Sequence, residues 1–253
     1  MSIDTIDTIE LAAKAVRLAK YNYTAAIILA AGSSTRMGLN VNKQFERLRG
    51  IPVLAHTLKA YENCPVIREI IVVSSAKSIK LVEDLVKAYG ITKVTRVVAG
   101  GQTRQASAIC GLRAVSDKAH FVAIADGARC LTTPMQIANV CLHAYRHNAA
   151  SAAHKVTDTI KRANAAGMSQ ATVDRAKLWQ AQTPQVFHTA LYTAALHRAV
   201  KERFVATDDN ALIENLGYRV CMVECGLQNI KITTPDDLPL AEAILAYREA
   251  HNQ

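Results

Sequence analysis

Three short segments of this 253-residue chain place glycines and charged side chains at the ends of apolar runs. The first, LAAGSSTRMGLNVNKQF (29–45), has a turn of small residues followed by Arg36 and Lys43. Backbone N–H groups in such a turn can approach a phosphate closely, and two cations would neutralise part of its charge. The segment is neither a dinucleotide-binding GxGxxG nor the GK[ST] of a phosphate-loop NTPase. An ordinary strand-to-helix turn with solvated Arg and Lys is the alternative reading.

The other two segments carry complementary groups. In AGGQTRQAS (99–107), Gly100 and Gly101 permit backbone contact with a flat ligand such as a base, and Ser107 could donate a hydrogen bond. In IADGARCLTTP (124–134), Asp126 ends an apolar run and Arg129 follows it. A carboxylate there suits ribose hydroxyls or a magnesium ion. The alternatives are a helix cap for the first segment, and an Asx turn with a surface arginine for the second.

The elements that must position these segments alternate between β-rich and helical stretches. Continuous apolar strands separated by helices predict an α/β fold, with a Rossmann-like, mostly parallel sheet flanked by helices. The predicted strands of the sheet cover residues 25–29, 69–74, 94–98, 121–126 and 218–224. The predicted helices cover residues 52–61, 78–89, 103–115, 134–147, 189–203, 208–216 and 235–249. Ligands of such sheets bind at the carboxyl ends of the strands, where the three segments lie.

The pattern changes at about residues 152–178. HKVTDTIKRA and ATVDRAKLW are charged, β-like stretches on either side of ANAAGMSQ. Their alternation leaves few side chains for a core, so we expect a β-hairpin arm that projects from the sheet.

The first 23 residues predict a helical extension, and residues 24–253 predict one domain. The extension has no long apolar region and carries Asp4, Asp7 and Glu10, which argues against a targeting peptide. Its apolar stripe would consist of Ile3, Ile6, Ala13 and Val16. We expect this helix to pack on the domain or on a partner subunit.

Composition excludes several function classes. The formal net charge is +9, from 30 Lys+Arg and 21 Asp+Glu, so an anionic partner is expected. Nucleic acid is not, because aromatic residues are only 5% and do not interleave with the basic ones. The longest apolar run, residues 25–31, is far below the roughly 20 residues that span a membrane, so no membrane association is expected.

The six cysteines and one histidine pair also bear on localisation and metals. The cysteines form no CxxC pair, which favours reduced thiols in a cytoplasmic protein. His143 and His147 are four residues apart on a predicted helix, without the Glu of HExxH or an evident third ligand. We therefore expect a surface or partly buried pair of histidines there.

Seven motifs in order resemble one enzyme family. They are LAAGSSTRMG…NKQF, VVAGGQTRQAS, ADGARC, DTIKR, TVDRAKLWQAQTPQVF, TDDNALIE and NIKITTPDDLPLAE. Together they are similar to the 2-C-methyl-D-erythritol 4-phosphate cytidylyltransferases of the non-mevalonate isoprenoid pathway. The resemblance runs from about residue 25 to residue 245, and LWQAQTPQVF and NIKITTPDDL are its most specific parts.

The resemblance implies a role for individual residues. Arg36 and Lys43 match the cations that stabilise the transition state, and Arg175 and Lys231 match those that hold the acceptor phosphate. The positions that match nucleotide contacts are Ala30, Ala31, Gly32, Ser33, Gly101, Gln102, Ser107 and Asp126. The positions that match acceptor contacts are Asp126, Arg129, Arg175, Thr183, Thr207 and Lys231. Asp126 also matches a position near magnesium, which the triphosphate would largely hold.

The implied reaction transfers CMP from CTP to 2-C-methyl-D-erythritol 4-phosphate and releases pyrophosphate. The implied cofactor is Mg²⁺ or another divalent cation, and the implied partners are CTP and a sugar-alcohol phosphate. The resemblance further implies a homodimer formed through the arm, which carries acceptor-binding residues into the neighbouring active site.

Some positions depart from the family pattern, and other readings stay open. Ala125, Gly127 and Cys130 replace the usual residues of HDAARP, and Gln102 stands where an acidic residue is common. A ribitol-5-phosphate cytidylyltransferase is the nearest alternative, because few side chains decide the choice of acceptor. A catalytically impaired nucleotide-binding homologue is another, although the cations Arg36, Lys43, Arg175 and Lys231 are all present and argue against it.

Overall fold

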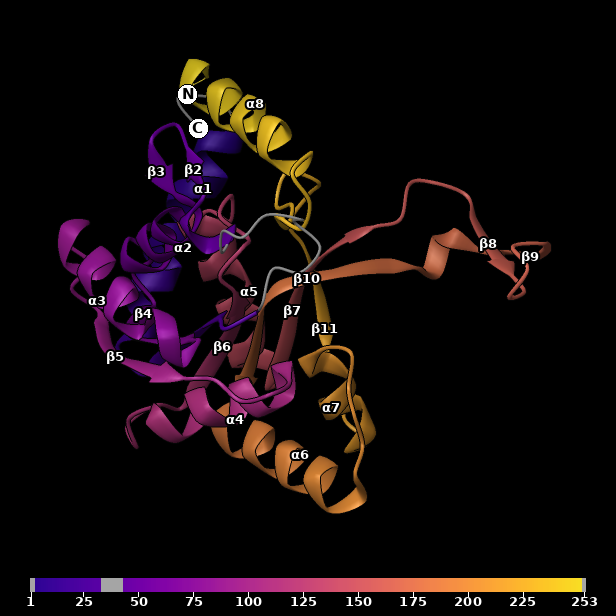
Figure 1. The fold of residues 1–253 in the computed structure, drawn as a ribbon, viewed down its shortest axis with the longest axis horizontal. Coiled ribbons are helices and arrows are strands. Elements are labelled where there is room, and N and C mark those ends of the chain that lie inside the picture. The colour runs from indigo at the N-terminus through magenta and orange to yellow at the C-terminus, as the bar shows by residue number, and fades with distance from the viewer. Residues whose placement is uncertain (1–2, 33–42, 252–253) are drawn as a thin grey trace.

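The computed structural model describes residues 3–32 and 43–251. They form a seven-stranded sheet of strand order β11-β7-β10-β6-β1-β4-β5 (Figure 1). Strand β10 runs antiparallel to both of its neighbours, and all other pairs are parallel, which confirms the predicted class. The bounds are β1 Thr24–Ala30, β4 Ile67–Ser74, β5 Val94–Ala99, β6 Phe121–Asp126, β7 Ala149–Lys155, β10 Trp179–His188 and β11 Cys221–Glu224.

Helices cover both faces of the sheet because the strands are apolar on both sides. Along β1, Ile28 packs into the core on one face, and Ile27 into the core on the other. The first face carries α1 Ile3–Ala19, α2 Val53–Glu62, α3 Ile79–Ala88 and α5 Pro134–His147. The second carries α4 Arg104–Ala114, α6 Thr189–Glu202 and α7 Asp209–Asn215. No helix in the described ranges is both long and apolar enough to cross a membrane.

A third, smaller cluster closes the end of the domain. Helix α8 (Asp237–Ala250) lies beside the short strands β2 (Arg47–Leu48) and β3 (Ile51–Pro52). Leu48 and Ile232 are buried between these elements.

The boundaries of helices α2 to α8 agree with the sequence prediction to within two residues, and capping side chains fix the starts of α4, α5 and α7. Helix α5 matches the prediction at both ends. Thr133 accepts a hydrogen bond from the Gln136 N–H, and the Gln136 side chain accepts one from the Thr133 N–H. With Pro134 in the first turn, this capping box fixes the start of the helix.

Two strands of the sheet escaped the sequence prediction. Strand β7 has the sequence AASAAHK, and alanine has a low β propensity, so its pattern does not indicate a strand. Strand β10 contains Pro184 and three glutamines, which are uncommon in strands, so its pattern does not indicate a strand either. The last strand, β11, begins at Cys221 rather than at the predicted Tyr218. Tertiary pairing therefore overrides the local pattern at this side of the sheet.

The projecting hairpin arm is confirmed. Strands β8 (Ile160–Ala163) and β9 (Ser169–Val173) form their own antiparallel pair, followed by a short 3-10 helix, η4 (Arg175–Lys177). Figure 1 shows the hairpin extending well away from the sheet. Residues 152–155, which the sequence reading assigned to the arm, belong to β7, so the arm starts beyond Lys155.

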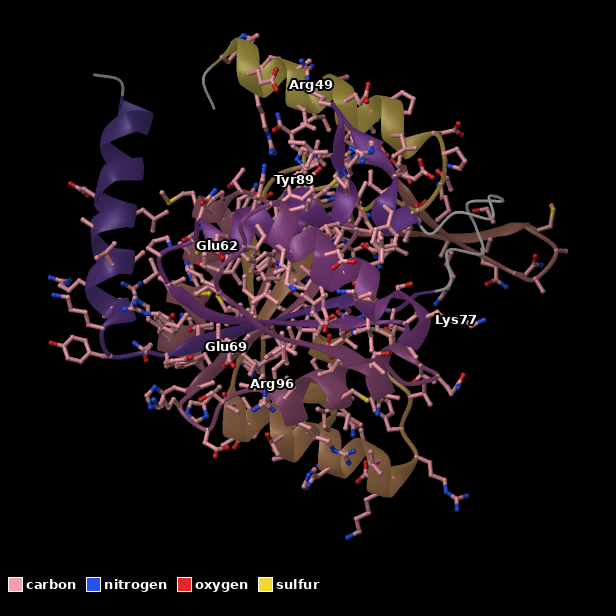
Figure 2. All side chains as sticks on the ribbon, turned by 60° about the vertical axis from the view of Figure 1, so that its left-hand side comes forward. Arg49, Glu62, Glu69, Lys77, Tyr89 and Arg96 are labelled. Carbon is pink, nitrogen blue, oxygen red and sulfur yellow. The ribbon has the colours of Figure 1, made fainter. Side chains whose placement is uncertain are left out.

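The N-terminal helix α1 packs against α5 and lies along the outer side of the domain (Figure 2). Its packed face contains Ala15, Leu18 and Ala19, whereas the predicted stripe residues Ala13 and Val16 are exposed. The stripe prediction is wrong for these two residues. Small alanines allow close approach to α5 on a different face of the helix.

Candidate active site

The carboxyl ends of β1, β5 and β6 lie at one edge of the sheet. Leu29 of β1 pairs with Asp126 of β6, and Ser74 of β4 pairs with both Ala30 and Ala99. The glycine-containing segments that follow these three strands therefore converge. Ligands of open α/β sheets bind at this edge.

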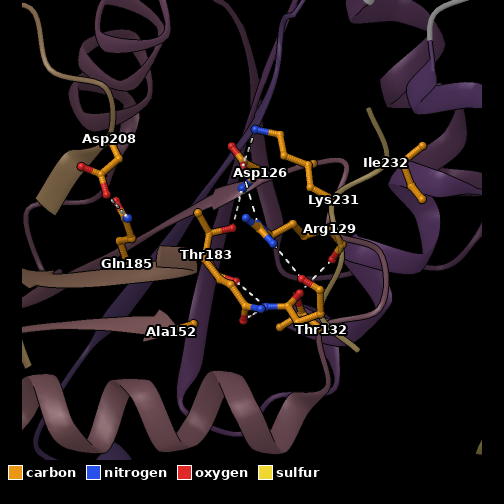
Figure 3. A network of polar contacts seen from close by, with 12 residues as sticks. Asp126, Arg129, Thr132, Ala152, Thr183, Gln185, Asp208, Lys231 and Ile232 are labelled. Atoms are coloured by element: carbon orange, nitrogen blue, oxygen red, sulfur yellow. Dashed lines mark hydrogen bonds and ion pairs between the residues drawn. The ribbon is translucent and has the colours of Figure 1, made fainter. Parts of the chain in front are cut away.

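Asp126, the last residue of β6, is surrounded by three cations. Its Oδ2 lies 2.9 Å from Lys231 Nζ and 3.6 Å from Arg129 Nε, and its Oδ1 lies 3.7 Å from Arg104 Nε. Figure 3 shows Lys231 and Arg129 pointing toward this carboxylate from different parts of the chain. The carboxylate thus holds together three positively charged side chains that would otherwise repel one another.

These charges decide the protonation of Asp126. Burial alone would raise its pKa, but Lys231 and Arg104 outweigh burial and leave the pKa below the ordinary value. Burial also lowers the pKa of Arg129, and the neighbouring Asp126 opposes that shift. Asp126 is therefore a carboxylate at neutral pH, and Arg129 remains a guanidinium because its ordinary pKa is so high.

Arg104 connects Asp126 to a second buried carboxylate that the sequence analysis did not single out. Its Nη1 lies 2.5 Å from Asp209 Oδ2, and the Tyr192 hydroxyl donates to Asp209 Oδ1 at 2.6 Å. Burial raises the pKa of Asp209, and Arg104 counteracts the shift. The adjacent Asp208 caps α7 by accepting from the Ala211 N–H. A sequence signal existed, since Arg104 and Asp209 lie inside the GGQTRQAS and TDDNA motifs.

Asn229 holds the loop that carries Lys231. Asn229 is fully buried, and its side-chain amide donates to Gln182 Oε1 and to the Thr183 carbonyl. Its backbone carbonyl accepts a hydrogen bond from Arg129 at 2.7 Å. Thr132 donates to Asn229 Oδ1 at 2.7 Å. Asn229 is a positioning residue that the sequence prediction did not name, although it is the first residue of the NIKITTPDDL motif.

The same loop contacts the first segment. The Ile232 N–H donates to the Ala128 carbonyl at 2.9 Å, and Lys43 Nζ donates to the Ile232 carbonyl at 2.9 Å. Lys43 therefore lies beside the loop that carries Lys231, although the two lysines are far apart in the sequence.

Gly100 and Gly101 form a tight corner, as the sequence predicts for a close backbone approach. A Cβ on Gly100 would lie 2.7 Å from Ala31 Cβ, and a Cβ on Gly101 would lie 2.5 Å from Ala106 Cβ. The Ser107 hydroxyl contacts both the N–H and the carbonyl of Gly101. Ser107 thus fixes the conformation of the corner.

A cavity of about 520 Å³ lies between these segments. Its wall brings together eight of the residues that the sequence analysis nominated, along with Arg104. The eight are Ala31, Gly32, Lys43, Gly101, Gln102, Ser107, Asp126 and Lys231. Four segments that are separated in the sequence therefore build one polar cavity.

The remaining nominated residues lie elsewhere. Arg129 and Thr183 do not line the cavity but contact Asp126. Arg129 forms an ion pair with its carboxylate, and Thr183 Oγ1 accepts a hydrogen bond from its N–H at 3.0 Å. Ala30 is buried in β1. Thr207 is exposed just before α7, and Arg175 is exposed on the arm, where it donates to the Thr157 carbonyl. Ser33 and Arg36 lie outside the described residues.

The departures from the family pattern are accommodated around the cavity. Ala125 and Cys130 are buried, and burial raises the pKa of the Cys130 thiol to about 12. A Cβ on Gly127 would lie 2.9 Å from Gln44 Oε1 and 3.2 Å from Ala30 Cβ. A larger residue at position 127 would therefore crowd the Gln44 side chain, and glycine leaves room for it.

A larger cavity of about 810 Å³ lies between α4 and α6, on another part of the molecule. Its wall is mainly apolar, with Ile109, Leu112 and Leu196 among its residues. It lacks the convergence of a carboxylate with several cations, so we assign the functional site to the smaller, polar cavity.

Comparison with known sequences identifies relatives of the whole domain. The family model described as 2-C-methyl-D-erythritol 4-phosphate cytidylyltransferase matches residues 24–247. A protein of that name from Syntrophus aciditrophicus is 42% identical over 225 residues, covering 88% of this chain and 96% of the relative. Another from Clostridium novyi is 42% identical over 221 residues, covering 87% and 95%.

Solved structures agree with this assignment. The 4-diphosphocytidyl-2C-methyl-D-erythritol synthase of Anaerococcus prevotii superposes with a TM-score of 0.81 at 28% identity, over 91% of this chain and 99% of that chain. The 2-C-methyl-D-erythritol 4-phosphate cytidylyltransferase of Thermus thermophilus gives a TM-score of 0.71 at 31% identity, over 88% and 98%.

Proposed function

Because the chain belongs to the 2-C-methyl-D-erythritol 4-phosphate cytidylyltransferase family, we propose that it transfers CMP from CTP to 2-C-methyl-D-erythritol 4-phosphate. A phosphate oxygen of the acceptor attacks the α-phosphorus of CTP and forms a new P–O bond. The bond between the α-phosphorus and the bridging oxygen breaks, and pyrophosphate leaves with the electron pair. The product is 4-diphosphocytidyl-2-C-methyl-D-erythritol, a precursor in isoprenoid biosynthesis.

The observation that carries this proposal is the charge distribution at the cavity. Among the described residues that line the cavity or pair with its charged groups, there are four cations and two carboxylates. The cations are Lys43, Arg104, Arg129 and Lys231, and the carboxylates are Asp126 and Asp209. The positive excess suits a triphosphate and a sugar phosphate in one cleft. Phosphoryl-type transfer depends mainly on positioning and on neutralisation of charge, which fixed cations supply.

The reaction needs no general base, and the cavity agrees with that requirement. The acceptor phosphate is already anionic at neutral pH, because its second pKa is about 6. Among the described lining residues, the ionisable side chains are Lys43, Arg104, Asp126 and Lys231. Asp126 is a weak base because its pKa is lowered. These groups orient substrates and neutralise charge.

Within this proposal, the nucleotide lies against the glycine corner. Ala31, Gly32, Gly101 and Ser107 would contact the nucleotide, together with Gln102 at the rim. Lys43 would neutralise charge on the phosphates, and the family resemblance assigns the same role to Arg36. Lys231 would hold the acceptor phosphate next to Asp126, and Arg129 would position Asp126. The exposed Thr207 is assigned to the acceptor by resemblance alone.

A magnesium ion fits the donor set only if the nucleotide supplies most ligands. Asp126 is ionised and lines the cavity, and its Oδ1 has one ion-pair contact at 3.7 Å among the described residues. No group of three His, Cys, Asp or Glu residues with ligand atoms close together occurs at this cavity in the described chain. Magnesium commonly binds through one or two carboxylates plus substrate phosphates. When bound, the ion would neutralise charge on the triphosphate and the departing pyrophosphate.

We also propose a homodimer in which the arm of each subunit completes the other active site. Arg175, which the family resemblance assigns to the acceptor phosphate, sits on the exposed arm and not in the cavity wall of its own chain. The arm extends away from the domain that carries it (Figure 1). An exchange of arms would supply the missing cation. All six cysteines are free thiols, which supports a reducing compartment such as the cytoplasm.

The decisive test is pyrophosphate release in the presence of CTP and Mg²⁺. We expect rapid release with 2-C-methyl-D-erythritol 4-phosphate and little with ribitol 5-phosphate. A preference for ribitol 5-phosphate would reassign the acceptor, and no release with either would indicate an impaired homologue. ATP, GTP and UTP in the same assay measure base selection, with Gln102→Glu as the variant that restores an acidic side chain.

A further inference from the structure

A cluster of two imidazoles and one thiol lies on the domain away from the catalytic cavity. His143 and His147 belong to the last turns of α5, and Cys221 is the first residue of β11. Their ligand atoms all lie within 4.8 Å of one another. Cys221 Sγ is 3.7 Å from His143 Nδ1, and the two imidazole rings are stacked with centroids 6.3 Å apart.

The tertiary structure creates this cluster from elements that are distant in the sequence. Helix α5 is followed by Asn148 in a left-handed conformation, and the chain then enters β7 at once. Strand β11 runs parallel to β7 with Cys221 opposite Ala150, and α5 packs on both strands. Cys221 is thereby brought next to the two histidines and provides the third ligand that the sequence pattern lacks.

We propose that His143, His147 and Cys221 bind a zinc ion. Imidazole nitrogens and thiolates are the ligands that Zn²⁺ prefers, whereas Mg²⁺ and Ca²⁺ require oxygen ligands, which are absent from this cluster. A tetrahedral zinc with bonds of about 2.3 Å to sulfur and about 2.05 Å to nitrogen holds those two atoms about 3.6 Å apart. The observed 3.7 Å between Sγ and Nδ1 matches that spacing.

The partly exposed position of the cluster leaves room for a fourth ligand. His143 and Cys221 are half-buried, and His147 is exposed, so a water molecule can complete the coordination from the solvent side. Three protein ligands and one solvent ligand constitute an accessible site that can exchange its metal.

The charged surroundings of the cluster moderate its affinity for a metal ion. Arg146 and Lys14 act electrostatically on His143, and both would repel a dication. We therefore expect a site that saturates with added zinc and is readily emptied by a chelator.

Occupancy would tie an edge strand of the sheet to a helix. Strand β11 pairs with a single neighbour, β7, and the chain beyond it continues to Asn229 and Lys231. A metal between α5 and β11 would stabilise that edge because it binds only the folded arrangement. The catalytic cavity shares no residue with the cluster, so turnover does not require this ion.

Cobalt titration of the full-length protein without a histidine tag tests the proposal. Co²⁺ occupies zinc sites and gives a thiolate charge-transfer absorption band when sulfur is a ligand. We expect one Co²⁺ per chain, appearance of this band and displacement by Zn²⁺. Cys221→Ser abolishes the band, and His147→Gln weakens binding by at least about tenfold. Cys110→Ser, which alters another half-buried thiol, leaves the titration unchanged.

Circular dichroism and thermal unfolding without metal check that each variant folds. Should Cys221→Ser not fold, His147→Gln alone decides the matter, because its side chain is exposed. Absence of the band in the wild-type protein overturns the proposal. So does a band that survives in Cys221→Ser, or zinc binding that is the same in wild type and His147→Gln.

Discussion

Lys231 Nζ lies 2.9 Å from Asp126 Oδ2, and this ion pair joins the loop after β11 to the carboxyl end of β6. The pair borders a cavity that also contains Lys43 and the glycine corner. Asp126 is ionised and orients Lys231 at a point where an incoming phosphate can share the ammonium group. In the proposed reaction, this pairing would position a cation for the substrate in advance and so reduce reorganisation.

Replacement of Lys231 by methionine should decrease kcat/KM by about 10²–10³, because one fixed charge is removed from the phosphate site. The apolar stem of similar length limits other changes. Pyrophosphate release measures the effect. Lys77→Met is the matched control, since Lys77 is exposed and points into solvent (Figure 2). Equal activity of the two variants would contradict the assigned role.

Arg104→Gln should destabilise the protein by about 2–3 kcal/mol, because Asp209 remains buried without its charged partner. Arg104 is one-third exposed, and Tyr192 still donates to Asp209, so the loss falls at or below the lower end of the range for buried pairs. Without Arg104, the raised pKa of Asp209 rises further. Denaturant unfolding measures the loss.

The pH dependence of this loss has a definite sign. A carboxyl group whose pKa is raised in the folded state binds more protons there than in the unfolded state, so stability falls as pH increases. The deficit of Arg104→Gln should therefore be smaller at pH 5 than at pH 8. Arg113→Gln, on the exposed side of the same helix, should show no such trend. A deficit independent of pH would refute the charge argument.

Asp126→Asn should lower the free energy of unfolding at neutral pH, and the difference from the wild type should vanish in acid. The pKa of Asp126 is lowered in the folded state, so its ionised form stabilises the protein above the unfolded value of 3.8. The contribution disappears as pH falls through the lower, folded pKa. Unfolding curves from pH 7 to pH 3 should show the wild-type advantage shrinking only below about pH 4. Asp117→Asn, an exposed control, should give no comparable change.

Thr183→Val should reduce both stability and turnover, because the Asp126 N–H loses its acceptor in a buried setting. An unsatisfied buried donor costs about 1–3 kcal/mol. Thr183→Ser retains the hydroxyl and should recover most of the loss. Chemical denaturation and steady-state kinetics on both variants make the comparison. A valine variant as stable and as active as the wild type would contradict the role of the hydroxyl group, because valine keeps the methyl group and lacks only this acceptor.

Arg175→Met and Lys231→Met should each be nearly inactive but should complement one another when mixed. If the arm serves the partner's site, a heterodimer contains one site with both changes and one intact site. Half of randomly exchanged dimers are heterodimers, so activity should reach about a quarter of the wild-type value. A mixture no more active than its components would show that Arg175 acts within its own chain, or that it plays no part in catalysis.

Local interactions made part of this structure predictable. Helices α5 and α7 begin within one residue of their predicted starts, and in the structure Thr133 and Asp208 cap them. Most sheet strands followed from continuous apolar runs. The meeting of the segments after β1, β5 and β6 also followed, because the carboxyl ends of parallel strands share one edge of the sheet. The glycine corner at Gly100 and Gly101 was visible as a dipeptide at a strand end.

Other features depend on contacts between distant parts of the chain. Strand β7, rich in alanine, becomes a strand through its pairing with β10 and β11, against its own propensity. Asn229 and the Arg104–Asp209 pair acquire their roles only from neighbours that folding brings to them.

By itself, the sequence determined the fold class and the order of the elements, because periodicity, capping and turn residues act over a few positions. Its motifs, together with the family resemblance that they carry, named most of the residues around the cavity. Only the tertiary structure decided that three cations share the carboxylate of Asp126 and that Cys221 joins His143 and His147. The physical reason is that electrostatic and coordination geometry depends on distances in space, and sheet pairing and helix packing set these distances.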